Sequence, residues 1–421
     1  MFTRLYSLLF YLVFPAVVLR LAFRAVREPA YSERWLERFG ICEPITEDEL
    51  IWVHAVSAGE TIAAVPLIRK LQVRFPGAAF AVTTMTPTGS ERVSALLGSS
   101  VYHMYAPYDL PGMVNRFLHR IRPKMLIIID TELWPNIIHQ CHRRSIPVLL
   151  VNGRLSPQSA KGYERIGGLT KAMLARMTHV ASQSESQARR FESLGLSPQR
   201  STATGSIKFD LTLPEDLSER QPQLVQRIGT DRLTFIAAST HEGEEEILLD
   251  AYETIWRSVP EMLLIMVPRH PDRFDAVTKL CLNRGFNVTR HSEGEDCRRD
   301  SNVFIVDSMG ELLYFYSVSD IAFAGGSLVP IGGHNMMEAA AFGLPIIMGP
   351  HRFHVDDIAQ SFVAAGALEE VKDSAELVDV LGRLGSDNNL REEMGRGALK
   401  VMKENSGALD RVAALVEHHL A

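Results

Sequence analysis

The sequence predicts an α/β protein built from two Rossmann-like domains, each with a parallel sheet covered by helices. Short runs of Val, Ile and Leu alternate along the chain with amphipathic helical patterns. Continuous apolar strands separated by helices are typical of parallel sheets that are buried on both faces. The chain has 421 residues, which is too long for one typical domain and suits two of about 150–200 residues.

The first element along the chain is an apolar segment. Residues 5–19 are apolar except for Ser7, and Arg4 and Arg20 bound the segment. As a helix it is about 22 Å long, which is short of a hydrocarbon core of ~30 Å, although residues 21–23 could extend it. The arginines that follow place the bulk of the chain on the cytoplasmic side of a membrane. They are Arg20, Arg24, Arg27, Arg34 and Arg38.

A buried core helix is the alternative interpretation of this segment. A cleaved signal peptide fits poorly, because only Arg4 precedes the apolar run and no small-residue cleavage site precedes the later charges. We therefore expect the N-terminus to be a membrane anchor that is not part of the catalytic core.

The candidate strands divide into two sets. The first set is predicted at residues 51–54, 80–83, 101–104, 125–129, 148–151 and 180–181, with helices that include 62–74 and 113–121. The second set is predicted at residues 233–237, 262–267, 303–306, 321–323 and 345–348. Residues 211–222 contain two prolines and several charges, and we interpret them as the interdomain linker. Because ligands of such sheets bind at the carboxyl ends of the strands, we expect the two domains to face a central cleft.

Polar residues that follow strands of the first half are candidates for chemistry. Glu60 comes after strand 51–54, where a helix begins, and its carboxylate could take a proton from an acceptor hydroxyl. A glutamate favoured only by the helix dipole is an equally good interpretation. Asp130 and Glu132 follow the most apolar strand of this half. Lys208 could neutralise charge on a leaving phosphate, although a solvated surface lysine is the more common case.

Two loops of the first half carry helix signals. Residues 83–90 are rich in hydroxyl groups, which could bind sugar or phosphate oxygens, but Thr or Ser before a helix also forms a good cap. Pro135 suits the first turn of a helix.

The second half has its own set of polar strand ends. Arg269 follows strand 262–267 and is suited to a bidentate phosphate contact. Residues 239–245 and 307–312 follow two other strands. We expect these strand ends to converge on one nucleotide-sized site.

A glycine-rich segment completes this predicted site. Two glycines occur at 325–326 and two more at 332–333, directly before His334 and Asn335. Glycine allows close backbone approach, and a helix that starts there would present free N–H groups to a phosphate. Glu338 would share a helix face with His334, four residues earlier, and could take ribose hydroxyls. An ordinary strand-to-helix turn is the alternative.

Composition excludes some classes of function. The net charge is −6 and the pI is near 6.2, which argues against a nucleic-acid-binding protein. The four cysteines are scattered without a Cys-x-x-Cys pair, so reduced thiols are expected. No Asp-x-Asp motif occurs, which favours a metal-independent reaction, and His351 and His354 lack an evident third ligand.

Matches to one family run through nearly the whole chain in order. The sequence resembles the 3-deoxy-D-manno-octulosonic acid (Kdo) transferases of lipopolysaccharide assembly. The matching stretches are His54–Glu60, Thr84–Arg92, Thr131–Asn136, Gly205–Asp210, Ser239–Glu245, Pro268–Pro271, Met309–Leu312, Gly325–Val329, Gly332–Asn335, Glu338–Ala340 and Met348–Pro350.

The resemblance implies a GT-B fold with an N-terminal membrane-anchoring helix, catalytic lobes in the cytosol, and a location at the cell inner membrane. The donor would be CMP-Kdo and the acceptor a tetra-acylated lipid A precursor (lipid IVA), with inversion at the anomeric carbon and neither metal nor cofactor. Glu60 matches the catalytic base, and Asp130 and Lys208 match residues that stabilise the transition state. The CMP site would comprise Pro268, Arg269, Met309, Gly310, Glu311, Asn335, Met336, Met337 and Glu338.

Three positions depart from the family pattern. Asp130 stands where the family usually has Glu, and it is one methylene shorter. Gly153 replaces Ala in an Asn-Ala-Arg stretch, and His354 replaces Asn after Phe353.

We expect residues 1–40 to form the membrane anchor and basic segment, 41–211 the acceptor domain, and 212–421 the CMP-sugar-binding domain. Two other functions fit parts of the sequence. One is a GT-B-type sugar-nucleotide epimerase, which would use UDP and would need no lipid anchor. The other is a non-catalytic, membrane-tethered nucleotide-binding protein.

Overall fold

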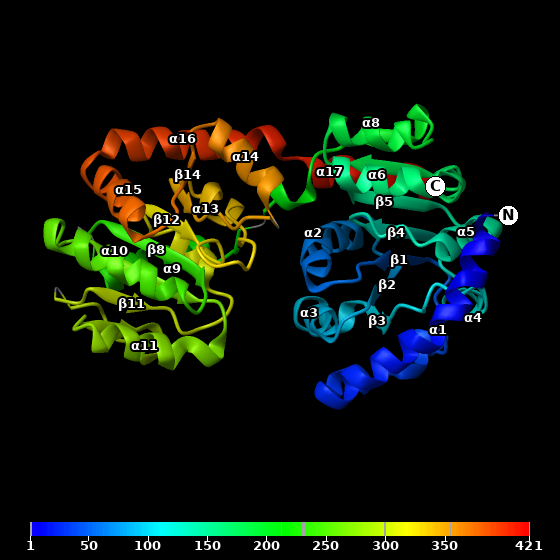
Figure 1. Cartoon of the computed structure of the whole chain (residues 1–421), viewed down its shortest axis with the longest axis horizontal. Helices are drawn as coiled ribbons and strands as arrows, with labels where there is room; N and C mark the ends of the chain where they lie inside the picture. Colours follow the sequence, from blue (N-terminus) through cyan, green and yellow to red (C-terminus); the bar gives the residue numbers. More distant parts are fainter. Residues whose placement is uncertain (1, 212, 230–231, 299, 354, 421) are drawn as a thin grey trace. The chain divides into compact units, whose positions relative to one another are not determined.

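The structure is a computed structural model that describes residues 2–211, 213–229, 232–298, 300–353 and 355–420. The chain forms two compact units, one comprising Met1–Asp210 with Ser406–Ala421 and the other Leu211–Asn405. Each unit contains one seven-stranded sheet in which every pairing is parallel (Figure 1). The prediction of an α/β protein with two such sheets is confirmed.

The first unit has the strand order β3-β2-β1-β4-β5-β6-β7. Its strands are β1 (Leu50–His54), β2 (Ala79–Thr84), β3 (Tyr102–Tyr105), β4 (Met125–Ile129), β5 (Val148–Gly153), β6 (His179–Ser182) and β7 (Ser201–Ala203). Its α-helices are α1 (Phe2–Arg27), α2 (Ala58–Arg74), α3 (Pro87–Leu97), α4 (Pro111–Ile121), α5 (Pro135–Arg143), α6 (Pro157–Arg165), α7 (Gly167–Leu174), α8 (Glu185–Ser193) and α17 (Ala408–Leu420). Short 3-10 turns are η1 (Pro29–Ser32), η2 (Trp35–Phe39), η3 (Gly98–Ser100), η4 (Pro198–Arg200) and η5 (Ile207–Phe209).

Local sequence explains where several of these helices begin. The side chain of Thr86 accepts the N–H of Gly89 at 3.1 Å and caps α3, as the capping pattern predicts. Pro135 stands in the first turn of α5, where its missing N–H costs nothing. All five residues of β4 are buried, because helices cover both faces of the sheet.

The second unit has the strand order β10-β11-β9-β8-β12-β13-β14. Its strands are β8 (Thr234–Thr240), β9 (Leu263–Pro268), β10 (Val288–Arg290), β11 (Val303–Ile305), β12 (Ile321–Ala324), β13 (Ile346–Met348) and β14 (Leu368–Glu370). Its α-helices are α9 (Leu217–Ile228), α10 (Glu244–Ser258), α11 (Phe274–Asn283), α12 (Leu312–Tyr316), α13 (Met337–Ala341), α14 (Asp356–Ala364), α15 (Ser374–Ser386) and α16 (Asn388–Asn405), with 3-10 turns η6 (Pro271–Arg273) and η7 (His291–Glu293).

The last helix does not belong to the second unit, so the predicted domain of residues 212–421 is wrong at its end. α17 packs on the first unit, where Val412 and Val416 share an apolar cluster with Ile68 of α2. The Asp210 carboxylate accepts the N–H groups of Gly407 at 2.5 Å and Leu409 at 2.6 Å. The buried apolar area and these two hydrogen bonds attach α17 to the first unit.

The apolar segment at the N-terminus is also part of the first unit, so residues 1–40 do not form a separate segment. In α1, Thr3, Ser7 and Leu21 are buried. The Phe14 ring lies edge-on to Tyr108 at 5.2 Å between centroids, and Arg38 is 1% exposed. Most of the apolar surface of α1 is nevertheless exposed, and among the described residues α1 is the one helix long and apolar enough to cross a membrane, with a mean hydropathy of 2.0.

Three local predictions also need correction. The predicted linker, 211–222, includes the first turns of α9, because Pro222 sits inside that helix rather than breaking it. Strands β7, β10 and β14 were not predicted, because their sequences (STA, VTR and LEE) contain polar residues and give no apolar run. Helix α13 begins at Met337, so His334 lies before the helix and does not share its face with Glu338.

Candidate functional site

The candidate catalytic residues of the first unit surround the point where its strand order reverses. β2 and β3 lie on one side of β1, whereas β4 and the later strands lie on the other. Glu60 follows β1 through the first turn of α2, and Asp130 follows β4 directly. In open parallel sheets this reversal at the carboxyl ends of the strands is where ligands bind.

The Glu60 carboxylate is held within its own helix turn. One oxygen, Oε2, accepts the Val56 N–H at 2.8 Å, and Oε1 accepts the Ser57 hydroxyl at 2.8 Å. The Ser57 hydroxyl also caps the helix by accepting the Glu60 N–H. Glu60 therefore serves the helix terminus, as the alternative interpretation expects, while its side chain remains partly exposed.

The pKa of Glu60 is raised by its surroundings, which suits a role beyond helix capping. Burial raises its pKa to about 7, with further contributions from the negative charges of Glu132 and Asp130, although the bonds from Ser57 and Val56 act in the opposite direction. A general base works best when its pKa lies near the working pH. Perturbed pKa values cluster at functional sites, so this carboxylate is the strongest candidate base of the first unit.

Asp130 and Lys208 are linked through a residue to which the sequence assigned no role. The buried Asn152 donates from Nδ2 to the Asp130 carboxylate at 2.5 Å and accepts the Ile207 N–H at 3.2 Å through Oδ1. Asp130 and Asn152 both have positive φ, 56° and 60°, a backbone region that Asn and Asp tolerate better than most residues. Asn152 thus joins the ends of β4 and β5 to the η5 turn that carries Lys208. The signal in the sequence that could have identified Asn152 is its position in an Asn-Gly-Arg stretch at the end of a strand.

Glu132 lies close to Glu60 and is hydrogen-bonded to Trp134. The Trp134 indole N–H donates to Glu132 Oε2 at 2.9 Å. The Trp134 ring lies edge-on to His54 with centroids 4.8 Å apart, and burial lowers the pKa of His54 to about 3, so that imidazole is neutral. Trp134 therefore orients the second carboxylate beside Glu60.

We expect Glu132→Gln to shift the pH dependence of the reaction. Because the Glu132 charge raises the pKa of Glu60, removing it lowers that pKa, and the base is ionised at lower pH. The acid limb of kcat/KM against pH should move to lower pH. Glu164→Gln, on the exposed surface of α6, is the matched control and should leave the limb in place.

The hydroxyl-rich loop after β2 is used within the protein. Thr83 accepts the Trp52 indole N–H at 2.8 Å and lies 2.9 Å from His54 Nδ1. Thr84 pairs with His103 at 3.0 Å, and Thr86 caps α3. These contacts favour the capping interpretation of residues 83–90 over a sugar-binding loop.

In the second unit, Arg269, Asn335 and Glu338 meet beyond the sheet's carboxyl edge. Arg269 follows β9, and its N–H donates to Thr240 O at 3.0 Å. Asn335 donates from Nδ2 to Glu338 at 3.1 Å and accepts the Met337 N–H at 3.0 Å, both within its own turn. Burial raises the pKa of Glu338, opposed by the Asn335 bond and the charge of Arg269. Asn335 and Arg269 therefore both lie close enough to Glu338 to affect its charge.

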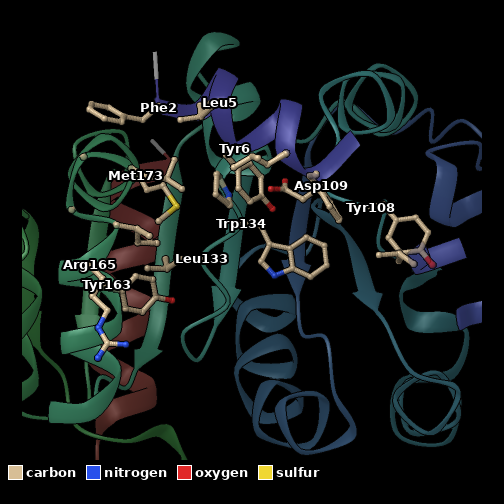
Figure 2. Close-up of a pocket in the computed structure, with 18 of the residues that line it drawn as sticks. Phe2, Leu5, Tyr6, Tyr108, Asp109, Leu133, Trp134, Tyr163, Arg165 and Met173 are labelled. Atoms are coloured by element: carbon tan, nitrogen blue, oxygen red, sulfur yellow. The ribbon is translucent and has the colours of Figure 1, made fainter. Parts of the chain in front are cut away.

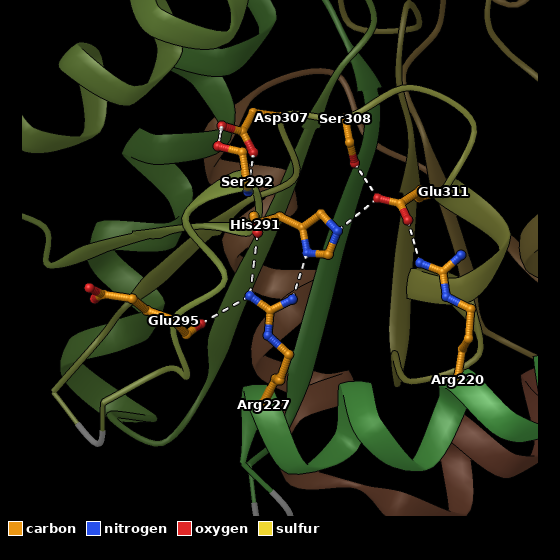
Figure 3. Close-up of polar contacts among 8 residues, drawn as sticks. All are labelled: Arg220, Arg227, His291, Ser292, Glu295, Asp307, Ser308 and Glu311. Carbon is orange, nitrogen blue, oxygen red and sulfur yellow. Dashed lines mark hydrogen bonds and ion pairs between the residues drawn. The ribbon is translucent and has the colours of Figure 1, made fainter.

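Glu311 belongs to a separate polar network that fixes the loop before α12. Figure 3 shows its carboxylate accepting hydrogen bonds from Ser308, Arg220 and His291, the last at 2.7 Å. Burial alone would raise the pKa of Glu311, but these partners outweigh it and the pKa is lowered. Arg227 donates to His291 Nδ1 at 3.1 Å, so Nε2 is the ring nitrogen directed at Glu311. Glu311 thereby holds Met309 and Gly310, the latter at φ 87°, in place.

The N–H groups of the first glycine turn, at residues 325 and 326, are hydrogen-bonded within the protein. Glu244, fully buried, accepts the N–H groups of Gly326, Ser327 and Leu328 at 2.8–3.0 Å. The protein's own carboxylate thus fills the anion-binding turn. The N–H groups of residues 332–334 are also taken, by the carbonyls of Gly325 and Gly326. Sequence reasoning missed Glu244 because only the fold brings it to this turn.

The remaining predicted positions are placed as follows. Pro268 ends β9, and Met336 and Met337, both buried, begin α13. His354, paired in the sequence with His351 as a weak metal candidate, lies outside the described residues. Within the described ranges no group of three His, Cys, Asp or Glu side chains is arranged to hold a metal ion.

The chain is similar in sequence to known proteins of one family. Residues 33–211 match a family described as 3-deoxy-D-manno-octulosonic-acid transferase (kdotransferase). The 3-deoxy-D-manno-octulosonic acid transferase of Haemophilus influenzae is 39% identical over 421 residues, which cover 99% of this chain and 98% of that protein. The enzyme of the same name from Bordetella pertussis is 32% identical over 385 residues, covering 88% and 87%.

A solved structure supports the fold. The UDP-GlcNAc 2-epimerase from Neisseria meningitidis, bound to UDP-GlcNAc, aligns with a TM-score of 0.60 over 88% of this chain and 100% of that chain. Its sequence identity is 13%, so this likeness concerns the two-domain GT-B-like fold alone. The sequence relatives, aligned over nearly their full length, carry the family assignment. The chain therefore belongs to the 3-deoxy-D-manno-octulosonic acid (Kdo) transferase family and is a glycosyltransferase.

Proposed function

We propose that this protein transfers Kdo from CMP-Kdo to a tetra-acylated lipid A precursor, lipid IVA, with inversion of the anomeric carbon and without a metal ion. The observation that carries the proposal is the Glu60 carboxylate, with a pKa of about 7, at the strand-order reversal of the first unit. A carboxylate there is suited to accept a proton from a sugar hydroxyl near neutral pH.

The proposed reaction is one displacement. The acceptor hydroxyl oxygen bonds to the anomeric carbon of Kdo while its proton passes to Glu60. The bond from that carbon to the phosphate oxygen breaks, and CMP leaves with the electron pair. Attack opposite the leaving group inverts the anomeric carbon. Asp130 and Lys208 stabilise the transition state, and Asn152 positions both of them.

The donor's nucleotide is assigned to the second unit. Arg269 meets the phosphate, because its guanidinium can form two charge-assisted bonds, and Glu338 takes the ribose hydroxyls beside Asn335. The backbone at Pro268 and at Met309 to Glu311 surrounds the base, held by the Glu311 network. Met336 and Met337 support this surface from the start of α13.

The location we propose is the inner membrane, with both units on the cytoplasmic side. Support comes from the apolar α1 and from the arginines that follow it, since anionic headgroups attract such residues by about 1 kcal/mol each near the surface.

A donor comparison tests the proposal. The purified protein is incubated with lipid IVA and either CMP-Kdo or UDP-GlcNAc, and the products are analysed by mass spectrometry. We expect Kdo to be added to the lipid, with release of CMP, only from CMP-Kdo, and the spectrum counts the units added. Epimerised UDP-GlcNAc with an unmodified lipid would instead identify the epimerase that the fold also allows, and nucleotide binding with neither product would identify a binding protein.

A further inference from the structure

A large apolar cavity lies beneath α1 in the first unit, at a place that the proposed roles above leave unused. Its volume is about 800 Å³, within the range typical of small-molecule sites. Figure 2 shows Leu5 and Tyr6 of α1 on one side and Leu133, Trp134 and Met173 on the others.

Helix α1 is fixed over this cavity by polar contacts. Arg176 donates to the Thr3 hydroxyl at 2.9 Å, and the Ser7 hydroxyl donates to Asn136 Oδ1 at 2.9 Å. The Tyr6 hydroxyl is hydrogen-bonded to the buried Asp109, which also accepts the N–H groups of Asn136 at 3.0 Å and Ile137 at 2.8 Å. The cavity is thus a built feature, and loose packing of a terminal helix does not account for it.

The cavity is open and its rim is apolar. Leu5 and Leu9 are each 55% exposed, and Ile166 is 49% exposed, although all three line the cavity. Contiguous exposed apolar surface of this kind marks a binding site for an apolar partner. Arg165 adds a positive charge at the rim, suited to the anionic group of an amphiphile.

The cavity lies next to the candidate catalytic carboxylates, to which two of its lining residues are linked. Trp134 lines it and donates its indole N–H to Glu132, whose charge acts on both Glu60 and the cavity-lining Tyr163. Met85 also lines the cavity, and its N–H donates to Val56 O at 2.9 Å, one residue before the cap of α2. A molecule with an apolar tail in the cavity would therefore carry its polar end toward Glu60.

We propose that this cavity binds one acyl chain of the lipid acceptor and so places the acceptor's sugar hydroxyl at Glu60. This inference rests on the proposed function for the identity of the acceptor. It assigns to α1 a substrate-binding role in addition to membrane attachment: the face over the cavity holds the acceptor's chain, and the outer apolar face is left for the bilayer.

Matched tryptophan variants on α1 test the proposal. Leu5→Trp places a bulky ring in the cavity, whereas Leu8→Trp places the same ring on a residue that is 60% exposed and does not line the cavity. We expect Leu5→Trp, and likewise Leu9→Trp, to raise the acceptor KM at least about tenfold. The KM for CMP-Kdo and co-sedimentation with anionic phospholipid vesicles should not change, which also shows that the variants fold. Leu8→Trp should leave all three values unchanged.

Equal acceptor KM values for Leu5→Trp and Leu8→Trp would overturn the proposal. So would a Leu5→Trp defect that follows a loss of vesicle binding, because the cavity would then hold bilayer lipid. A second arm needs no turnover: a fluorescent polyene fatty acid should bind the wild type and Leu8→Trp, and bind Leu5→Trp at least about tenfold more weakly. Binding of that probe without Kdo transfer would reject the proposed function but support binding of an apolar chain in the cavity. Kdo transfer without probe binding would reject only the proposal that the cavity binds an acyl chain.

Discussion

Glu60→Gln is expected to lower the rate of Kdo transfer by at least about 10²-fold, because it removes the proposed base for the acceptor's proton. Binding of CMP should persist, since the residues assigned to the nucleotide all belong to the second unit. Steady-state kinetics with CMP-Kdo and lipid acceptor measure the first effect, and calorimetry with CMP measures the second.

The structure explains why this substitution isolates the chemistry. A glutamine oxygen can still accept the Val56 N–H, which Glu60 Oε2 accepts at 2.8 Å, so the start of α2 should be preserved. Glu91→Gln, on the exposed face of α3, removes the same charge elsewhere in the first unit and should not change the rate. Turnover of Glu60→Gln within a fewfold of wild type would reject Glu60 as the base.

Arg269→Ala is expected to weaken CMP binding by about 10- to 100-fold, because a hydrogen bond to a charged group contributes about 1.5–3 kcal/mol. The glycine turn cannot replace Arg269, since Glu244 already accepts its N–H groups. Titration calorimetry with CMP is the measurement.

The control for Arg269 is an arginine of the same unit with no part in the site. Arg257 is 71% exposed and pairs with Glu253 along α10, and such surface pairs contribute little to stability. Arg257→Ala should bind CMP as the wild type does. Unchanged affinity in Arg269→Ala would place the phosphate elsewhere, with Asn335 and the first residues of α13 as the next candidates.

Local patterns in the sequence predicted the elements that local interactions define. The buried strand at 125–129 and the proline at the start of α5 needed only a few neighbouring residues to be recognised. Thr86 caps α3 through a residue three positions away. Glu60 was placed correctly at the start of α2 for the same reason, although its raised pKa depends on Glu132 and Asp130, which only the fold brings near.

Contacts between distant segments account for what the sequence could not provide. α17 was assigned to the wrong domain because its partners are Asp210 and α2, far away in the chain. The glycine turn looked like a phosphate site because nothing near it in sequence reveals Glu244 as its occupant. α1 looked like a detached anchor because its bond to Asn136 spans 129 residues. The apolar cavity lies beneath the same helix.

The most direct test of the account is the transfer reaction itself, measured as a function of pH with CMP-Kdo and lipid IVA. The dependence of kcat/KM on pH reports the essential groups of the free enzyme. Because Glu60 must be ionised to accept the proton, and its pKa is about 7, we predict a Kdo-lipid product whose kcat/KM rises with pH and levels off above that pKa. A profile that is flat from roughly pH 5 to 9, or the absence of product at every pH, would contradict the assignment of Glu60 as the base of a Kdo transferase.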